Sequence, residues 1–376
     1  MSEPETKPPL RRGWTTGTCA AAAARAAFEA LASGQFPDPV RVLLPGGARP
    51  AFALAMQELG ANFARAGIIK DAGDDPDVTH GALVIVRVSP GPPGSGLMFA
   101  AGEGVGTVTR PGLPLPVGEP AINPVPRQMI AAAIAGARAL VGGPADVVVE
   151  ISIPGGEKLA QRTLNGRLGI VGGLSILGTT GIVVPYSCAA WIDTIHRGID
   201  VARAMGLTHI AAATGSTSEK AVQKLYGMAD FALIEMGDFV GGLLKYLRGH
   251  PVENITIAGG FAKMTKLAQG MADLHSRRGE VDLAWLAGLA GGPVAGPIGR
   301  ANSALEAFAL ASTAGVNLAE PVAEAAWTTA AGLLKNTAIS LEIAVFDREG
   351  KLLARTGLRQ IPDRALPVRP LPPKVS

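Results

Sequence analysis

Short apolar runs alternate with longer amphipathic stretches through the second half of the chain, and this alternation is its clearest pattern. The runs at residues 208–213, 231–236 and 255–258 are rich in Ile and Ala and predict buried strands. The stretches around them have helical spacing, at residues 188–205, 217–226, 239–247 and 259–272. Strands that alternate with helices across short loops predict βαβ units in a parallel sheet.

The first half of the chain mixes short strands with two long helices. A nearly pure alanine stretch after residue 18 predicts the first helix, and residues 126–140 predict the second. The strand candidates are residues 39–45, 51–63, 64–70, 82–88, 97–101 and 147–153. This pattern predicts an α+β unit rather than a second run of βαβ units.

We therefore expect an α+β domain at residues 1–160 and a Rossmann-like parallel-sheet α/β domain at residues 161–299. Residues 341–355 have the pattern of a β-hairpin, which needs a larger sheet to join. We expect this hairpin to return to the first domain, so that residues 300–358 complete it. The Pro-rich residues 359–376 predict an extended tail.

Composition narrows the functional classes. Hydrophobic residues make up 48% of the 376-residue chain and charged residues 17%, which predicts a well-packed core. A net charge of +3 with mixed signs gives no nucleic-acid footprint. The two cysteines, Cys19 and Cys188, cannot form a disulfide framework, and no apolar run predicts a membrane span. We expect a cytoplasmic protein without nucleic-acid or membrane partners, and monomer and homodimer are both open.

Residues 13–18, with the sequence GWTTGT, form a hydroxyl-rich turn directly before the alanine helix. Thr16 or Thr18 caps the helix, or the turn helps to bind a ligand, because the first N–H groups of a helix lack internal partners. Residues 102–106, GEGVG, look like a nucleotide-binding glycine motif, but such a motif needs a helix directly after it. Residues 107–126 contain six prolines, which excludes a helix there. Residues 102–106 are therefore not the nucleotide-binding motif of a Rossmann fold.

An aspartate-rich loop at residues 70–81 is the densest charged feature. Pro76 lies where an EF-hand loop needs glycine, which excludes that type of calcium site. The aspartates either face a ligand or stabilise a solvated turn. His275 is likewise either a base or a structural residue. The histidines form no metal-ligand spacing, and we expect no metal site.

Several motifs in order resemble one family. They are residues 13–22 (GWTTGTCAAA), 70–81 (KDAGDDPDVTHG), 102–107 (GEGVGT), 118–126 (GEPAINPVP), 172–183 (GGLSILGTTGIV), 185–187 (PYS), 263–270 (KMTKLAQG) and 275–277 (HSR). This ordered set resembles the cobalt-precorrin-5B C(1)-methyltransferases, the CbiD family of cobalamin biosynthesis. The resemblance implies methyl transfer from S-adenosylmethionine to ring carbon 1 of a cobalt-bound corrinoid. Two alternatives stay open: a protein that carries the corrinoid without methylating it, and a non-catalytic or differently reactive protein that binds a nucleotide-derived ligand on its parallel sheet.

The resemblance leads to residue-level hypotheses. We expect His275 and Lys263 to be catalytic. We expect the methyl donor to contact Thr15, Thr16, Thr18, Asp71, Asp74, Asp75, Asp77, Gly102 and Gly104. We expect the corrinoid to contact Gly172, Gly173, Ser175, Thr179, Thr180, Arg127 and Arg277. Arginine and lysine would suit the carboxylates of the corrinoid.

Overall fold

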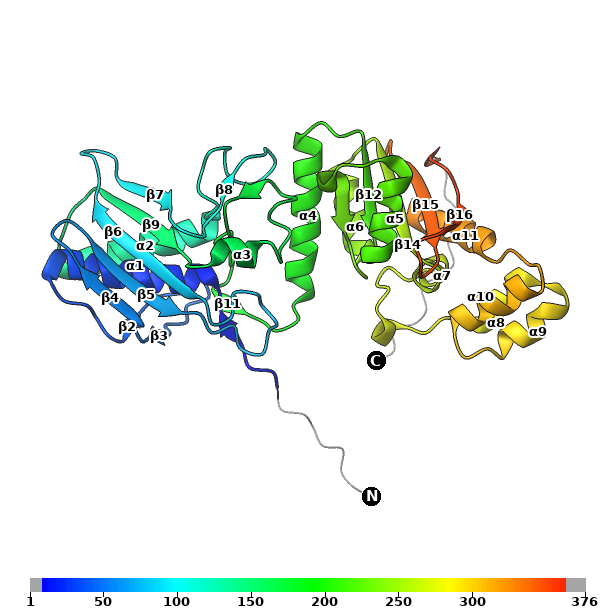
Figure 1. Ribbon diagram of the computed structural model, residues 1–376, viewed down its shortest axis with the longest axis horizontal. Helices are drawn as coiled ribbons and strands as arrows, with labels where there is room; N and C mark the ends of the chain where they lie inside the picture. Colours follow the sequence, from blue (N-terminus) through cyan, green and yellow to red (C-terminus); the bar gives the residue numbers. More distant parts are fainter. Residues whose placement is uncertain (1–8, 363–376) are drawn as a thin grey trace, which may run out of the picture. The chain divides into compact units, whose positions relative to one another are not determined.

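Helix α1 (Thr16–Ser33) packs against a β-sheet and a second helix in the first unit of the chain (Figure 1). The computed structural model describes residues 9–362, and the chain divides into two units, Met1–Ser187 and Cys188–Ser376. The alanines from Ala20 to Ala24 are almost completely buried. Because these side chains are small, α2 (Pro124–Val141) and a β-sheet can pack close to the α1 backbone.

The sheet of the first unit has five strands, in the order β4 (Met56–Leu59), β5 (Ala64–Ile69), β6 (Leu83–Pro90), β9 (Val147–Ser152) and β7 (Leu97–Ala101). All neighbours are antiparallel except β7 and β9. In β6, Val84, Val86 and Val88 are buried, whereas the residues between them are half-buried. This period of two places one sheet face against the helices.

Three short strand pairs complete the first unit. They are β1 (Gly13–Trp14) with β11 (Ile182–Val183), β8 (Thr107–Val108) with β10 (Ile170–Val171), and β2 (Val40–Arg41) with β3 (Ala51–Phe52). Helix α3 (Gly156–Ala160) follows β9. Since β10 and β11 pair with strands of the first unit, the expected boundary near residue 160 is wrong, and the units divide after Ser187.

The second unit contains the predicted parallel sheet. Its order is β13 (Leu233–Glu235), β12 (His209–Ala213), β14 (Asn254–Gly260) and β15 (Ser340–Phe346), all parallel. Helix α5 (Ser216–Tyr226) packs on one core cluster of this sheet. Helices α4 (Cys188–Ala204), α6 (Val240–Gly249), α7 (Phe261–Ala268) and α11 (Ala319–Leu333) pack on the other.

The C-terminal hairpin joins this second sheet, so the expectation that it returns to the first domain is wrong. Strand β15 pairs with β14 along seven residues, and β16 (Leu352–Arg355) and β17 (Arg359–Gln360) add antiparallel to β15. The physical reason lies in β15 itself: six of its seven residues are buried, which is typical of an interior strand covered by helices on both faces. Residues 363–376 of the predicted tail lie outside the described residues.

The remaining segments of the second unit are short helices. They are α8 (Leu283–Ala290), α9 (Ala295–Gly299) and α10 (Ala304–Thr313), with 3-10 turns at Asp230–Ala232, Ser276–Arg278 and Gly292–Val294. The chain thus has a mixed fold with one mainly antiparallel sheet and one mainly parallel sheet, as the sequence predicts. Within residues 9–362, no helix is long and apolar enough to cross a membrane.

Candidate functional site

Three of the sequence motifs meet in the first unit. We call residues 13–18, 70–81 and 172–181 together the N-terminal cluster. The Thr18 hydroxyl donates to the Gly181 carbonyl at 2.7 Å, and the Gly17 N–H donates to the Leu177 carbonyl at 3.2 Å. The Trp14 N–H donates to the Asp71 carbonyl at 2.8 Å. Backbone and hydroxyl hydrogen bonds therefore assemble segments that are far apart in sequence.

The threonines of the first turn are almost completely buried. Thr15 is the N-cap of α1, and its Oγ1 accepts from the Thr18 N–H at 3.2 Å. The exposed fractions of Thr15, Thr16 and Thr18 are 7%, 4% and 0%. A threonine thus caps the helix, but the expectation that this residue is Thr16 or Thr18 is wrong, because both lie inside α1. The prediction that these threonines contact the methyl donor stays a prediction.

Two carboxylates of the aspartate loop bind the segment before the turn. Asp71 forms a bidentate ion pair with the Arg11 guanidinium, with Nη2 to Oδ1 at 2.9 Å, and accepts from the Gly73 N–H at 2.9 Å. These hydrogen bonds, that of Arg11 first, lower the pKa of Asp71 to about 2. Asp74 accepts from the Arg11 N–H at 2.6 Å. Arg11 was not identified from the sequence, since nothing in its neighbours marks it.

The other two carboxylates also have protein partners. Asp75 accepts from the backbone N–H of Tyr186 at 2.8 Å. Asp77 forms an ion pair with Lys70, whose side chain is only 2% exposed, and it accepts from the Thr79 hydroxyl at 2.6 Å. The loop is thus held by its own carboxylates, and Asp74 is the exposed member of the four.

The glycines of residues 102–106 are needed for close packing. A Cβ on Gly102 would lie 2.1 Å from Ser152 Oγ, and one on Gly104 would lie 2.0 Å from the Ile153 carbonyl oxygen. Gly104 also has a φ of +71°, which disfavours any side chain. A Cβ on Gly173 would meet the Gly104 backbone at 2.3 Å. These contacts explain the three glycines without a ligand.

Part of the cluster faces solvent. Gly172, Thr179 and Thr180 are exposed, and the exposed fractions of Leu177 and Tyr186 are 52% and 68%. Ser175 is half-buried, with its hydroxyl 3.5 Å from Asn165 Oδ1. We call the exposed residues Asp74, Leu177, Thr179 and Thr180 of the cluster, together with Tyr186, which binds Asp75, the rim. The sequence analysis included Tyr186 in a family motif but gave it no role.

Arg127 has a structural set of partners. Its Nε donates to the Ile122 carbonyl at 2.8 Å, and its Nη2 donates to Glu119 at 2.8 Å. Its guanidinium also lies 5.0 Å from the centre of the Phe99 ring. These bonds already use much of the donor capacity of Arg127. Its predicted contact with the corrinoid stays a prediction.

In the second unit, the predicted residues Lys263 and His275 lie near one another at the carboxyl edge of the parallel sheet. Lys263, in the first turn of α7, forms an ion pair with Asp238 and donates to the Leu274 carbonyl at 3.3 Å. The Leu274 N–H donates to the Asp238 carbonyl at 2.9 Å. The peptide that precedes the exposed His275 is therefore held from two sides. Asp238 lies in the loop after β13, and in parallel α/β sheets such loops at the carboxyl ends of the strands are where ligands bind.

Lys266, which lies in the motif at residues 263–270 but was given no role from the sequence, is also a member of this group. Its Nζ donates to the Leu274 carbonyl at 3.2 Å, and the residue is 8% exposed. Burial first, and then the nearby Lys263 charge, lower the pKa of Lys266. Its spacing of three residues from Lys263 on a helix could have indicated it. Arg277 lies in the 3-10 turn Ser276–Arg278, and its side chain is outside the described part of the chain.

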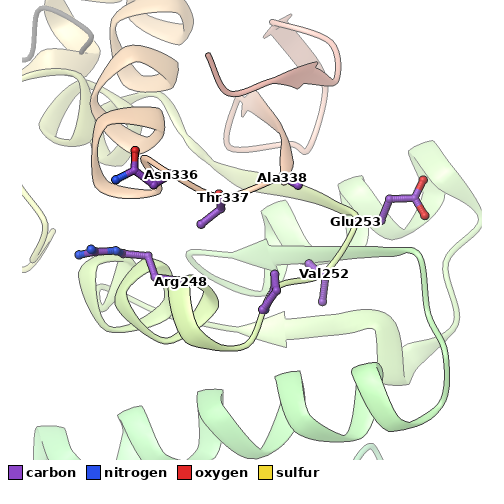
Figure 2. A pocket seen from close by; sticks show the side chains of 7 residues that line it. Arg248, Val252, Glu253, Asn336, Thr337 and Ala338 are labelled. Carbon is purple, nitrogen blue, oxygen red and sulfur yellow. The ribbon is translucent and has the colours of Figure 1, made fainter. Parts of the chain in front are cut away.

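A separate cavity of about 410 Å³ lies at the opposite edge of the second sheet. Figure 2 shows Arg248, from α6, and Asn336, after α11, on facing elements beside the opening. Glu253 and Ala338 precede β14 and β15, so the cavity is at the amino ends of these strands. None of the predicted site residues lines it. Among residues 9–362, no cluster of three or more His, Cys, Asp or Glu side chains could hold a metal ion.

The chain is similar to proteins of one known family. Residues 3–185 match the CbiD family model, and residues 273–357 match the model of the CbiD C-terminal domain. A cobalt-precorrin-5B C(1)-methyltransferase of Agrobacterium fabrum is 64% identical over 352 residues, which cover 92% of this chain and 93% of that protein. The protein of the same name from Methylorubrum extorquens is 61% identical over 350 residues, covering 92% and 97%.

A solved structure also matches. The crystal structure of the cobalamin biosynthesis protein (cbiD) from Archaeoglobus fulgidus is 31% identical in sequence. The match covers 70% of this chain and 82% of that chain, with a TM-score of 0.39.

Proposed function

The chain belongs to the CbiD family, and on this premise we propose that it transfers a methyl group from S-adenosylmethionine to carbon 1 of cobalt-precorrin-5B. The product is cobalt-precorrin-6A, an intermediate of cobalamin biosynthesis. The observation that carries this proposal is the identity of 61–64% to methyltransferases of that name over 92% of the chain. The enzyme class and the corrinoid substrate follow from those relatives.

The chemistry needs positioning more than acid–base groups. The nucleophilic ring carbon displaces the sulfonium sulfur in line, and the electron pair of the broken bond returns to sulfur. The donor becomes S-adenosylhomocysteine. Because the sulfonium is already activated, alignment of the two reactants and exclusion of water supply much of the acceleration.

We assign the two reactants to the N-terminal cluster as follows. Asp74 and Asp75 face the methyl donor, where carboxylate oxygens accept hydrogen bonds from ribose hydroxyls or from an amino group. Leu177, Thr179 and Thr180 face the corrinoid, because the rim offers an apolar side chain beside hydroxyls. This surface lies over packed residues: Thr15 and Thr18 are buried, and Gly102 and Gly104 make close contacts with neighbouring backbone and side-chain atoms.

The function is tested with methyl-labelled S-adenosylmethionine and cobalt-precorrin-5B. Label in the corrinoid, with release of S-adenosylhomocysteine, supports the methyltransferase. Corrinoid binding without label would support the carrier alternative. The donor assignment is tested by calorimetry of S-adenosylhomocysteine binding to Asp75→Ala and Thr16→Ala. Wild-type affinity in both variants would place the donor elsewhere.

A further inference from the structure

Two lysine side chains converge on one carbonyl oxygen at the carboxyl edge of the second sheet. Lys263 Nζ lies 3.3 Å from the Leu274 oxygen, and Lys266 Nζ lies 3.2 Å from the same atom. Both lysines belong to α7, at positions three residues apart. The two ammonium groups are therefore close neighbours, and their like charges repel.

Among the described residues, one carboxylate forms an ion pair with these two ammonium groups, so the two positive charges are not fully balanced. Lys263 has Asp238 as its ion-pair partner. Asp273 pairs with Arg278, at 3.5 Å, and among the described residues Lys266 makes no ion pair. Lys266 is only 8% exposed, and a buried ammonium is costly unless an anion or several acceptors compensate it. Burial and the Lys263 charge lower the pKa of Lys266, whereas Asp238, Asp273 and Glu280 act in the opposite direction.

The location is one where ligands bind in parallel α/β sheets. Lys263 and Lys266 follow β14, and Asp238 follows β13, so all three side chains start from the carboxyl edge. Helix α5 follows β12 on one face of the sheet and α7 follows β14 on the other, which makes the gap between these strands a switch point. Gly260, directly before α7, has open space where a Cβ would stand.

We propose that Lys266, together with Lys263, forms a binding subsite for a carboxylate group at the carboxyl edge of the second sheet. This inference rests on the proposed function, since both of its reactants carry carboxylates: the amino-acid end of the methyl donor and the acid side chains of the corrinoid. An ammonium has three N–H donors. Lys266 uses one of them on Leu274, so a carboxylate can accept another while Asp238 keeps its bond to Lys263.

The test compares full-length wild type with Lys266→Met, which keeps the length of the side chain and removes its charge. Calorimetry measures binding of S-adenosylhomocysteine and of its analogue without the amino-acid carboxylate. An absorbance titration measures binding of cobalt-precorrin-5B. Lys245→Met, at an exposed position of α6, is the matched control and is expected to bind all three ligands as the wild type does.

Loss of a charged hydrogen bond is expected to weaken the affected ligand by about 10- to 100-fold. Weaker binding of S-adenosylhomocysteine, with unchanged binding of the analogue, identifies the donor carboxylate as the occupant. Weaker binding of the corrinoid alone identifies a corrinoid carboxylate. Unchanged affinity for both reactants in a folded Lys266→Met protein overturns the subsite.

Lys263→Gln provides the same comparison at a half-exposed position if Lys266→Met does not fold. Unchanged affinities in Lys263→Gln then overturn the proposal. Label transfer by the wild type is measured in parallel. A wild type that transfers methyl while the variants bind normally refutes only the subsite, whereas a wild type that transfers none refutes the proposed function itself.

Discussion

The hydroxyl of Thr18 donates to the carbonyl of Gly181 at 2.7 Å, although 163 positions separate the two residues in sequence. Thr18 is fully buried, so water cannot replace this bond. A Cβ on Gly181 would approach Thr18 Oγ1 to 2.8 Å, and Gly181 has a φ of +81°. The contact therefore depends on both residue types, and it joins the start of α1 to the loop that carries Leu177, Thr179 and Thr180 of the rim.

Thr18→Val tests this contact with a side chain of the same shape. The variant removes one of the two donors to the Gly181 carbonyl, which keeps the Thr15 N–H at 3.1 Å, so we expect the free energy of unfolding to fall by about 1 kcal/mol. Thr179→Val, at an exposed position of the same cluster, should change it by less than about 0.5 kcal/mol. Denaturant unfolding measures both. Equal effects would mean that the Thr18 hydroxyl contributes nothing specific.

Gly104→Ala tests whether the glycine motif is structural. The added Cβ would meet the Ile153 oxygen at 2.0 Å, at a φ of +71°, so we expect a loss of about 2–4 kcal/mol. Gly136→Ala is the control, because Gly136 lies in α2 with open space around it. Alanine should stabilise that helix by about 0.5–1 kcal/mol. A stable Gly104→Ala variant that loses only donor binding would favour the cofactor role instead.

Acid stability depends on Asp71. Because Arg11 lowers the pKa of Asp71 from 3.8 to about 2, the folded state keeps this carboxylate charged where the unfolded state protonates it. The contribution is present above about pH 4 and is lost as the pH falls toward 2. Its size should be below about 1 kcal/mol, because solvent reaches about half of each side chain, 58% of Arg11 and 44% of Asp71. The midpoint of denaturant unfolding should fall less steeply between about pH 4 and pH 2 in Asp71→Asn than in the wild type. An equal dependence on pH in the two proteins would refute the assignment.

A buried network in the second unit predicts alkaline sensitivity. Tyr226 donates to Glu342, which is 1% exposed and also accepts from Thr256 at 2.9 Å. Burial, followed by the bond to Glu342, raises the pKa of Tyr226 from 10.0 to about 12. Stability from this group is therefore present below about pH 10 and is lost as the pH rises toward 12.

Tyr226→Phe should lower the free energy of unfolding at neutral pH by about 1–3 kcal/mol, since Glu342 loses a donor. The variant should also lose less stability above about pH 10 than the wild type does. Tyr186→Phe, at an exposed position, is the control. Denaturant unfolding at neutral and alkaline pH measures both effects, and identical profiles for the two variants would contradict the role of the network.

The sequence correctly predicted α1, α2 and the strands of the parallel sheet, because their apolar periods are regular, whereas the strand expected at residues 39–45 is only Val40–Arg41. The sequence did not predict which sheet the C-terminal hairpin joins, because a short strand pair can join either sheet and its place depends on the strand with which it pairs. The buried run in β15 was the available signal. In the N-terminal cluster, the sequence marked the correct motifs but not their partners. Tyr186 binds Asp75 through its backbone N–H, a group that every residue except proline has, and Arg11 binds Asp74 in the same way. The guanidinium of Arg11 also pairs with Asp71, but no local pattern links these two residues 60 positions apart.

The central claim is methylation at carbon 1, and it is tested most directly by locating the transferred label. The purified protein, incubated with methyl-labelled S-adenosylmethionine and cobalt-precorrin-5B, should give a corrinoid whose nuclear magnetic resonance spectrum places the label on carbon 1. One S-adenosylhomocysteine should form for each methyl transferred. A corrinoid that binds and returns unlabelled, or that carries the label at another ring position, would contradict the account.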